Sequence, residues 1–573
     1  MVLPSEAFCN LQNLEILQIA NNQISEYSPN VFNGLNNLKQ LTIFRERGTH
    51  TLPKGLFNDL PLLEVLHLNE SSFLENIDDD TLSSLSNLVE LDLSRCEVKD
   101  ISPNAFGNLK KLERLVLPEN NISQLDKNVF SNLHNLKELD ITCNSVKEFP
   151  DDLFRNLPYL ERMLAKENYL EMIQPDCFIS QELLTHLNLN DNCITAIKSN
   201  CFDNLTNLVT LEINNNRIEE LPVDVFKGLE TLEVLDLSGS FIKGLKCGIF
   251  QDLISLIDLN VCSNRIDIID DGCFDNLSNL EILDLSDNNL TNINFFAFVM
   301  LESLRELYLN RNKIEQFCPK VFSRMRNLQS LYLNGNNMSS MSNSLQDVIN
   351  GSESEQSECL RSITYLSLEN NNIKTIDPEV IAQFPNLETL SLDENKLESI
   401  DRNTFKNNTK LKTLKLPRNN ISGSLVGVFQ PIVSLVELNL SYNKIQIIPS
   451  ELFSGLNNLE NIALDNNEIQ TIDEKAFHNL NKLSQICLNH NRIEVISSNI
   501  LSNLPRIYFI NLMHNQISEI ALDNFENLPS LRYVHLKGNK LSPETSEYFI
   551  KKYPHEKQVK KFRCVRQETI ESM

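Results

Sequence analysis

One spacing recurs along almost the whole chain and constrains its fold more than any other feature. The pattern Leu-x-x-Leu-x-Leu-x-x-Asn returns every 24 residues, and a typical copy carries Leu112, Leu115, Leu117 and Asn120. The Asn slot falls at positions 22, 46, 71, 96, 120, 144, 168, 192, 216, 240, 264, 288, 312, 336, 371, 395, 419, 443, 467, 491, 515 and 539. Asn accordingly makes up 75 of the 573 residues, about 13%. Because one such repeat cannot bury its own apolar residues, neighbouring repeats must stack into a solenoid.

The pattern within each repeat predicts its local structure. Alternating Leu-x-Leu makes a short strand with one face buried, and the slot Asn can bond the backbone groups that leave the strand. A Phe column is expected behind the strands, at Phe106, Phe130, Phe154, Phe178, Phe202, Phe226, Phe250 and Phe274. Twenty-two parallel strands at about 4.8 Å spacing would give an inner arc of roughly 100 Å.

These repeats resemble the leucine-rich repeat family, specifically its 24-residue class with Phe in the second half. Toll-like receptors, chaoptin and the carrier subunit of circulating carboxypeptidase belong to that class. The resemblance implies an α/β solenoid shaped as a horseshoe, with about 22 repeats and a parallel β-sheet on the concave face. It also implies an extracellular or cell-surface location, since most of the class is extracellular.

The pattern divides the chain into four segments. We expect leucine-rich repeats over 1–336, an inserted acidic, Ser-rich loop over 337–362, further repeats over 363–550, and a basic C-terminal tail over 551–573. The chain begins inside a repeat, with neither a cap nor a signal peptide, which predicts that an upstream segment was lost. The sequence contains no run of about 18 apolar residues, so we expect no membrane span in it.

Composition and motifs exclude several functions. With 77 acidic against 51 basic residues the formal net charge is −26, which argues against nucleic acid as the main partner. No GxSxG elbow, glycine-rich phosphate loop or HExxH motif occurs, so we expect no enzyme, no catalytic residues, no cofactor and no metal site. His490, His514 and His535, with Cys487 nearby, favour an exposed polar row over a metal or pH-responsive site.

The outward strand positions predict a ligand-binding site. Carboxylates fill them in five consecutive repeats, and tyrosines follow directly along the chain. The predicted ligand-binding residues are Glu212, Asp236, Asp258, Asp284, Glu306, Tyr308, Tyr332 and Tyr365. A row of like charges favours a cationic partner, and Tyr suits a protein-binding surface. The alternative is that a chain this acidic shows carboxylates on every face.

The cysteines and sequons leave alternatives open. Cys177 and Cys201 share a slot in adjacent repeats, about 5 Å apart, which a disulfide could bridge, and Cys318 with Cys359 could close the inserted loop. Ten Asn-x-Ser/Thr sequons occur where chance alone gives about nine, so their number is no evidence of glycosylation. The candidate glycosylation sites are Asn69, Asn121, Asn350 and Asn420.

Two classes of function fit these features. The first is a non-enzymatic recognition protein, a receptor ectodomain or secreted binder whose concave face binds a protein or other macromolecule in innate immunity or cell adhesion. The alternative is a non-catalytic carrier or scaffold subunit that stabilises a protein partner. A cytosolic repeat protein with reduced thiols is a third, weaker hypothesis. Fold alone does not choose between them.

Overall fold

The computed structural model describes residues 2–22, 24, 26–45, 52–71, 74–175, 177–341 and 359–553. The chain forms two compact units. The first unit comprises Met1–Asp284 with Phe296–Leu301, and the second comprises Leu285–Phe295 with Glu302–Met573. Both are built from the predicted repeat.

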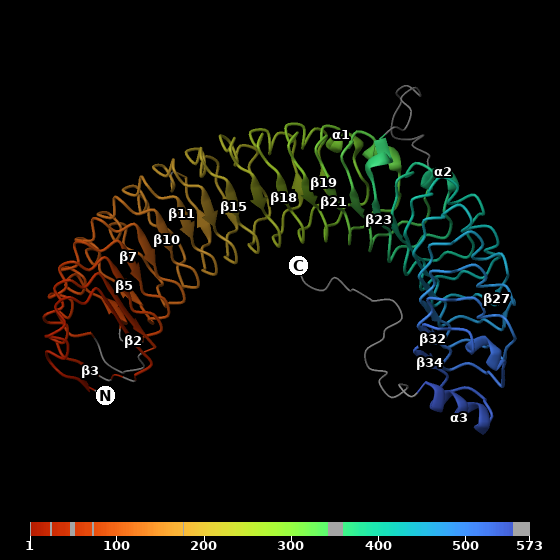
Figure 1. The fold of residues 1–573 in the computed structure, drawn as a ribbon. Helices are drawn as coiled ribbons and strands as arrows, with labels where there is room; N and C mark the ends of the chain where they lie inside the picture. The colour runs from red at the N-terminus through yellow and green to blue at the C-terminus, as the bar shows by residue number, and fades with distance from the viewer. Residues whose placement is uncertain are drawn as a thin grey trace. The chain divides into compact units, whose positions relative to one another are not determined.

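A parallel sheet of short strands runs through the described part of the first unit. Its strands lie on the inner side of this unit's curve, and each pairs with the next in parallel (Figure 1). They are β2 (Ile16–Ala20), β4 (Gln40–Phe44), β5 (Val65–His67), β7 (Glu90–Asp92), β9 (Arg114–Val116), β10 (Glu138–Asp140), β11 (Arg162–Leu164), β13 (His186–Asn188), β15 (Thr210–Glu212), β16 (Val234–Asp236), β18 (Asp258–Asn260) and β20 (Ile282–Asp284).

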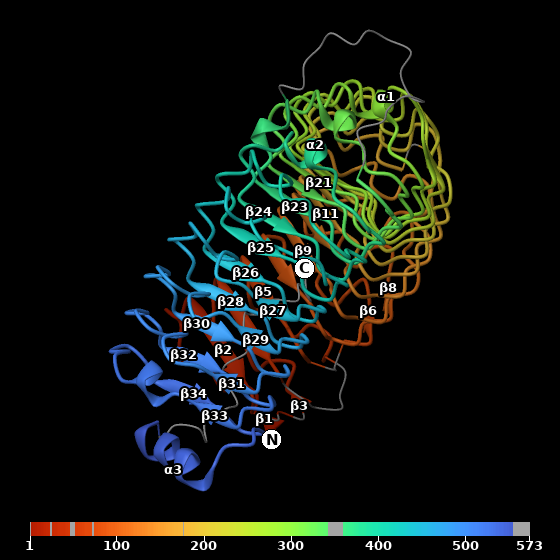
Figure 2. The ribbon, with the colours of Figure 1, turned by 90° about the vertical axis from the view of Figure 1, so that its right-hand side faces the viewer.

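The second unit has a parallel sheet of the same kind, whose strands follow one another in Figure 2. They are β21 (Glu306–Tyr308), β22 (Ser330–Tyr332), β23 (Tyr365–Ser367), β24 (Thr389–Ser391), β25 (Thr413–Lys415), β26 (Glu437–Asn439), β28 (Asn461–Ala463), β30 (Gln485–Cys487), β32 (Phe509–Asn511) and β34 (Tyr533–His535). With those of the first unit they give one strand for each of the 22 predicted repeats, and the fold is the predicted leucine-rich repeat solenoid.

Shorter elements complete the repeats. Two-residue strands pair as β1 (Val2–Leu3) with β3 (Glu26–Tyr27), β6 (Asn76–Ile77) with β8 (Asp100–Ile101), β12 (Met172–Ile173) with β14 (Ala196–Ile197), β17 (Gly244–Leu245) with β19 (Ile268–Ile269), β27 (Ile447–Ile448) with β29 (Thr471–Ile472), and β31 (Val495–Ile496) with β33 (Glu519–Ile520). The helices are α1 (Phe295–Phe298), α2 (Pro378–Ile381) and α3 (Pro543–Lys552), with 3₁₀ turns η1 (Pro319–Phe322), η2 (Cys359–Ser362) and η3 (Leu522–Phe525). Among the described residues, no helix is long and apolar enough to cross a membrane.

The core consists of columns of equivalent side chains from successive repeats. The middle residue of each three-residue strand is buried, as Leu139 and Leu211 show with no exposed area. Phe rings stack behind the strands, with centroids 5.6 Å apart for Phe154 and Phe178 and 6.1 Å apart for Phe226 and Phe250. The predicted Phe column is confirmed.

The slot Asn holds each repeat to the one before it. The Asn144 amide nitrogen donates to the carbonyls of Leu117 at 2.9 Å and Ile141 at 3.0 Å, and its oxygen accepts from the Ile122 N–H at 3.0 Å. Buried amides in this arrangement satisfy backbone groups that no strand partner reaches. In the slot at position 96, the Cys96 thiol donates to the Leu68 carbonyl instead.

The residue before the slot is held in the left-handed region of backbone space. Its φ is 54° at Cys143, 55° at Glu167 and 54° at Asp191, and the same sign recurs at most slots of both units. That conformation is uncommon for residues other than glycine. It aligns these side chains in a second outward column beside the strands.

Helix α3 ends the described repeats. Ser542 caps it by accepting a hydrogen bond from the Thr545 N–H at 3.1 Å, and Pro543 occupies its first turn. Phe549 of this helix lies edge-on to Phe525, with ring centroids 5.0 Å apart. Residues 551 and 552 therefore belong to a helix rather than to the predicted tail.

Both ends of the predicted insertion belong to packed repeats. Met338 and Met341 fill core positions at its N-terminal end, and Leu360 does so at its C-terminal end, so the predicted bounds of 337–362 are too wide. The pairing of β22 with β23 joins Ser330 to Tyr365, so the repeat resumes in register. The central part of the predicted loop, with Asn350, lies outside the described residues.

Candidate functional site

Four predicted carboxylates lie on the exposed face of the sheet in the first unit. Glu212, Asp236 and Asp284 are the third residues of their strands, whereas Asp258 is the first residue of β18. In the strand register Glu212 pairs with Asp236, but Asn260 stands between Asp236 and Asp284. The carboxylates therefore share a face without forming one unbroken row.

Acidic and amide side chains recur at the third strand position for a structural reason. Asp236 Oδ1 accepts the Ser238 N–H at 2.9 Å, two residues further on, and Asp140 accepts the Thr142 N–H at the same distance. In the same way the Ser94 N–H donates to Asp92, the Asn190 N–H to Asn188 and the Cys262 N–H to Asn260. Such side chains close the turn that leaves the strand. Turn closure thus accounts for part of the acidity of this face.

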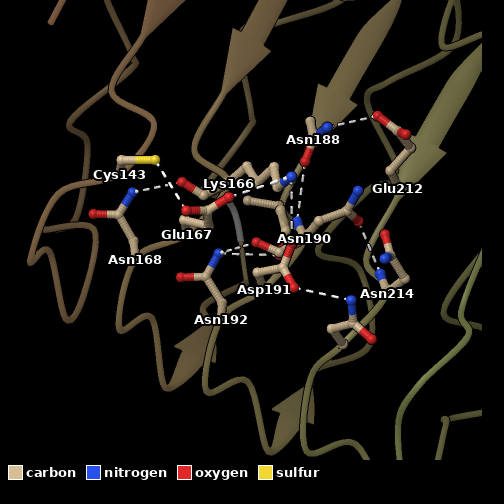
Figure 3. A network of polar contacts seen from close by, with 12 residues as sticks. Cys143, Lys166, Glu167, Asn168, Asn188, Asn190, Asp191, Asn192, Glu212 and Asn214 are labelled. Atoms are coloured by element: carbon tan, nitrogen blue, oxygen red, sulfur yellow. Dashed lines mark hydrogen bonds and ion pairs between the residues drawn. The ribbon is translucent and has the colours of Figure 1, made fainter. Parts of the chain in front are cut away.

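Glu212 belongs to a polar network that crosses several repeats of the first unit (Figure 3). The Asn188 amide donates to Glu212 Oε2 at 2.7 Å, and the Asn190 N–H donates to Asn188 Oδ1 at 3.0 Å. The Asn214 N–H continues the network by donating to Asn190 Oδ1 at 2.9 Å. These bonds fix the Glu212 carboxylate in place.

The same network includes an ion-pair cluster in the column of positive φ. Lys166 Nζ lies 3.3 Å from Glu167 Oε1 and 3.6 Å from Asp191 Oδ2, and the Cys143 thiol donates to Glu167 at 3.1 Å (Figure 3). The hydrogen bond from Cys143, together with Lys166, lowers the pKa of Glu167. These groups are already partnered, which leaves few free contacts for a ligand.

Further toward the N-terminus the exposed face carries its own ion pairs. Arg114 bridges Glu90 at 2.6 Å and Glu138 at 3.1 Å, and His67 Nε2 lies 3.1 Å from Glu90. These carboxylates are neutralised within the chain. A cationic ligand would have to compete with Arg114 for them.

The second unit presents a different surface, a stack of three tyrosines that we call the tyrosine ladder: Tyr308, Tyr332 and Tyr365. The rings of Tyr308 and Tyr332 are parallel within 6°, with centroids 4.4 Å apart. Tyr365 follows with its centroid 5.0 Å from that of Tyr332, tilted by 41°. It is the first residue of β23, whereas the other two are third residues, so it lies diagonally opposite Tyr332. The structure thus brings the three predicted tyrosines together.

Glu306 orients the first ring of the ladder. The Tyr308 hydroxyl donates to Glu306 Oε2 at 2.5 Å, from the same strand and the same face. Burial, reinforced by this bond, raises the pKa of Tyr308 well above its ordinary value. Burial likewise raises the pKa of Tyr365 to about 12. Tyr308 and Tyr365 therefore stay neutral at physiological pH.

Beside Tyr365 lies a group that sequence reasoning missed, which we call the Ser391 cluster: Ser391, Asp393, Lys415 and Glu437. Strands β24, β25 and β26 place it on the same exposed face, with Ser391 opposite Lys415 in the register. Burial, with Glu369 nearby, raises the pKa of Asp393 to about 7. The available signal was a run of polar residues at outward positions, but the pattern alone did not show that they lack partners.

The leucine-rich repeat model matches the chain at residues 2–47, 61–122, 110–165, 163–218, 206–261, 254–314, 278–338, 302–348, 353–397, 385–445, 433–493 and 483–541. The chain belongs to the leucine-rich repeat family.

Three relatives illustrate its similarity to known proteins. Toll-like receptor 3 of Boselaphus tragocamelus is 34% identical over 121 residues, which cover 21% of this chain and 13% of that protein. The Drosophila Toll–Spatzle complex matches with a TM-score of 0.56 at 17% identity, over 94% of this chain and 76% of that one. The mouse RP105/MD-1 complex matches with a TM-score of 0.52 at 24% identity, over 88% and 91%. At these identities the two structures establish the fold of this leucine-rich repeat protein.

The histidines of this leucine-rich repeat protein fall into two places. His490 and His514 occupy the column of positive φ, and their rings stack with centroids 4.5 Å apart. His535 lies instead at the third position of β34, edge-on to Phe509, and Cys487 is disulfide-bonded. No group of three or more metal-ligating side chains occurs within the described ranges.

The structure does not form the two predicted disulfides. Cys177 is a buried thiol whose pKa burial raises to about 12, and the Cys201 thiol donates to the Ile173 carbonyl at 3.2 Å. Equivalent positions of stacked repeats point in parallel directions, which keeps their sulfurs apart, whereas a disulfide needs converging side chains. Cys318 is also a thiol, and the side chain of Cys359 lies outside the described residues.

The predicted glycosylation sites differ in accessibility. Asn121 is exposed and makes no side-chain hydrogen bond among the described residues, whereas Asn69 is half-buried and donates to Asp92. Asn420 is half-buried at the position after the slot, the same position as Asn121. Glycosylation of these residues stays a prediction, with Asn121 the most open of the three.

Proposed function

We propose that this chain is a non-enzymatic recognition protein, a receptor ectodomain or secreted binder, that binds a protein ligand on the exposed face of its sheet at the tyrosine ladder. The observation that carries this proposal is the stack of Tyr308, Tyr332 and Tyr365 on three successive strands of the second unit. Tyrosine is enriched among the residues that dominate protein–protein binding energy.

Contacts within the chain hold the rings of the tyrosine ladder. Mutual stacking and the Tyr308–Glu306 hydrogen bond hold the rings, so binding would immobilise few additional rotamers. Such preorganisation improves affinity because each side chain ordered on association costs about 0.5–1.5 kcal/mol. The strands beneath the rings supply a rigid support.

The relatives support the receptor form of this proposal. A Toll-like receptor matches part of the chain, and the neighbours of similar fold include Toll with Spatzle and RP105 with MD-1. That likeness supports a location outside the cell or at its surface, and we propose innate immunity or adhesion as the setting. The match spans only 13% of Toll-like receptor 3. The activity of the whole receptor is therefore not assigned to this chain.

A selection experiment tests the proposal. Extracellular protein domains displayed on yeast would be selected against the intact chain, and each binder would be retested on the triple variant Tyr308→Ser, Tyr332→Ser, Tyr365→Ser. The matched control replaces three exposed tyrosines, Tyr159, Tyr169 and Tyr442, in the same way. Loss of binding to the ladder variant alone, by about 100-fold or more, is expected for a central contact. Binders that respond equally to both variants would contradict the proposal.

A further inference from the structure

The Ser391 cluster contains three oxygen atoms that are buried and have no hydrogen-bond partner among the described residues. They are Ser391 Oγ, Asp393 Oδ1 and Glu437 Oε1. Buried polar atoms are nearly always paired, and leaving one unpaired costs about 1–3 kcal/mol. Ser391 and Asp393 belong to the repeat of β24 and Glu437 to the repeat of β26, two strands away, so two neighbouring acceptors and a third, more distant one could be satisfied by a group from outside the chain.

Ser391 shows that the cluster is more than a patch of exposed acids. Its side chain is 1% exposed, yet it is the third residue of β24 and points to the face opposite the buried Leu390. The hydroxyl is enclosed by its neighbours on the binding side of the sheet. Asp393 follows two residues later on the same side.

The charges around the cluster favour a cation. Asp393 is flanked by Glu369 from the repeat of β23 and by Glu394 in its own repeat, with the neutral Tyr365 nearby. Arg418 pairs with Glu394 at 3.2 Å. Burial raises the pKa of both Asp393 and Glu437, and Lys415, on the strand between theirs, only partly opposes this effect. Lys415 makes no ion pair within the described part of the chain. One unpaired lysine therefore faces three unpaired carboxylates.

We propose that the Ser391 cluster is a subsite for an arginine side chain of a protein ligand, with the guanidinium donating to Ser391 and Asp393 beside the Tyr365 ring and Glu437 adding negative charge from two strands away. A guanidinium offers five donors in a plane and stacks on aromatic rings, whereas an ammonium offers three donors around one point. Two separated acceptors next to a tyrosine suit the first group. The protein nature of the partner rests on the proposed function, but the guanidinium chemistry does not.

The subsite can be tested without knowing the ligand. The probe is N-acetyl-argininamide, with N-acetyl-citrullinamide as its neutral counterpart of the same shape, and binding to the full chain is followed by saturation-transfer NMR. The double variant Asp393→Asn, Glu437→Gln removes two negative charges and replaces one oxygen of each carboxylate by an NH₂ donor. Its control, Glu398→Gln with Glu474→Gln, removes two exposed carboxylates that make no polar contact among the described residues.

We expect the arginine probe to bind the intact chain and the control variant alike, and the double variant at least about tenfold more weakly. The citrulline probe should bind none of them measurably. Affinity for the arginine probe should rise by about tenfold from pH 6 to pH 8, as Asp393 loses its proton. Equal loss in both variants, or equal binding of both probes, would overturn the subsite.

Failure here is distinguishable from failure of the proposed function. If the arginine probe does not bind but the ladder substitutions still abolish the selected ligands, the tyrosine surface stands and the subsite falls. If the arginine probe binds as described but the ladder substitutions have no effect, the subsite stands and the tyrosine surface fails as the binding site.

Discussion

Replacing Asp393 by Asn should stabilise the repeats around β24, and the gain should depend on pH in a defined way. The pKa of Asp393 is raised from 3.8 to about 7, chiefly by burial. A carboxyl group whose pKa is higher in the folded state favours folding when protonated, so that contribution is present below pH 3.8 and is lost as the pH rises through 7. Asparagine carries no charge to lose.

The magnitude follows from the size of the shift. About three pKa units at about 1.4 kcal/mol each amount to about 4 kcal/mol at pH 8, and to less than half of that at pH 5. Stability in repeat proteins is largely local, so the effect should concentrate in neighbouring repeats. Hydrogen exchange followed by mass spectrometry on peptides covering 385–420 reports it directly.

The decisive comparison is between the two pH values, with each variant measured against the wild type at the same pH. Asp393→Asn should slow exchange in these peptides much more at pH 8 than at pH 5. Glu398→Gln, an exposed neighbour in sequence, should change neither. A gain from Asp393→Asn that is the same at both pH values, or a loss at pH 8, would refute the reasoning because it would show that the folded chain accommodates the charged carboxylate.

Two further predictions test other parts of the structure. Asn144→Ala removes two donated bonds and one accepted bond inside the first unit, and should lower the free energy of unfolding by about 3 kcal/mol in urea denaturation, whereas Asn121→Ala on the surface should cost under about 0.5 kcal/mol. Expressed through a secretory route, the chain should lose the mass of one glycan on Asn121→Gln but not on Asn69→Gln, because the Asn69 amide is bonded to Asp92. Equal glycan occupancy at both sites would contradict that difference in accessibility.

Much of the fold was readable from the spacing of a few residue types. The 24-residue period placed Leu139 in the core, Phe178 in the stacked column and Asn144 in the slot, because equivalent positions of identical repeats must superimpose. The tyrosine ladder followed from the same period. Helix α3 was missed, although Ser542 followed by Pro543 is a recognisable start signal for a helix.

Periodicity failed where it was used to judge contacts between neighbours. It correctly placed Cys177 and Cys201 at equivalent positions of adjacent repeats, but it also suggested a disulfide between them. Their side chains point in parallel directions, and both remain thiols. It also did not show that the Asp236 side chain closes the turn at Ser238. The spacing of the repeats shows which residues are adjacent, but it does not show which of their atoms are in contact.

The sequence by itself therefore determined the repeat, its strands, its core columns and the faces on which polar residues lie, since these depend only on period and on the separation of apolar from polar positions. Only the tertiary structure decided which of those polar residues are already satisfied. Glu212 and Glu90 have partners within the chain, whereas Ser391, Asp393 and Glu437 each leave an oxygen without one. Hydrogen bonds form or fail over a few tenths of an ångström, a scale that is set by side-chain packing between repeats and that a 24-residue period does not record.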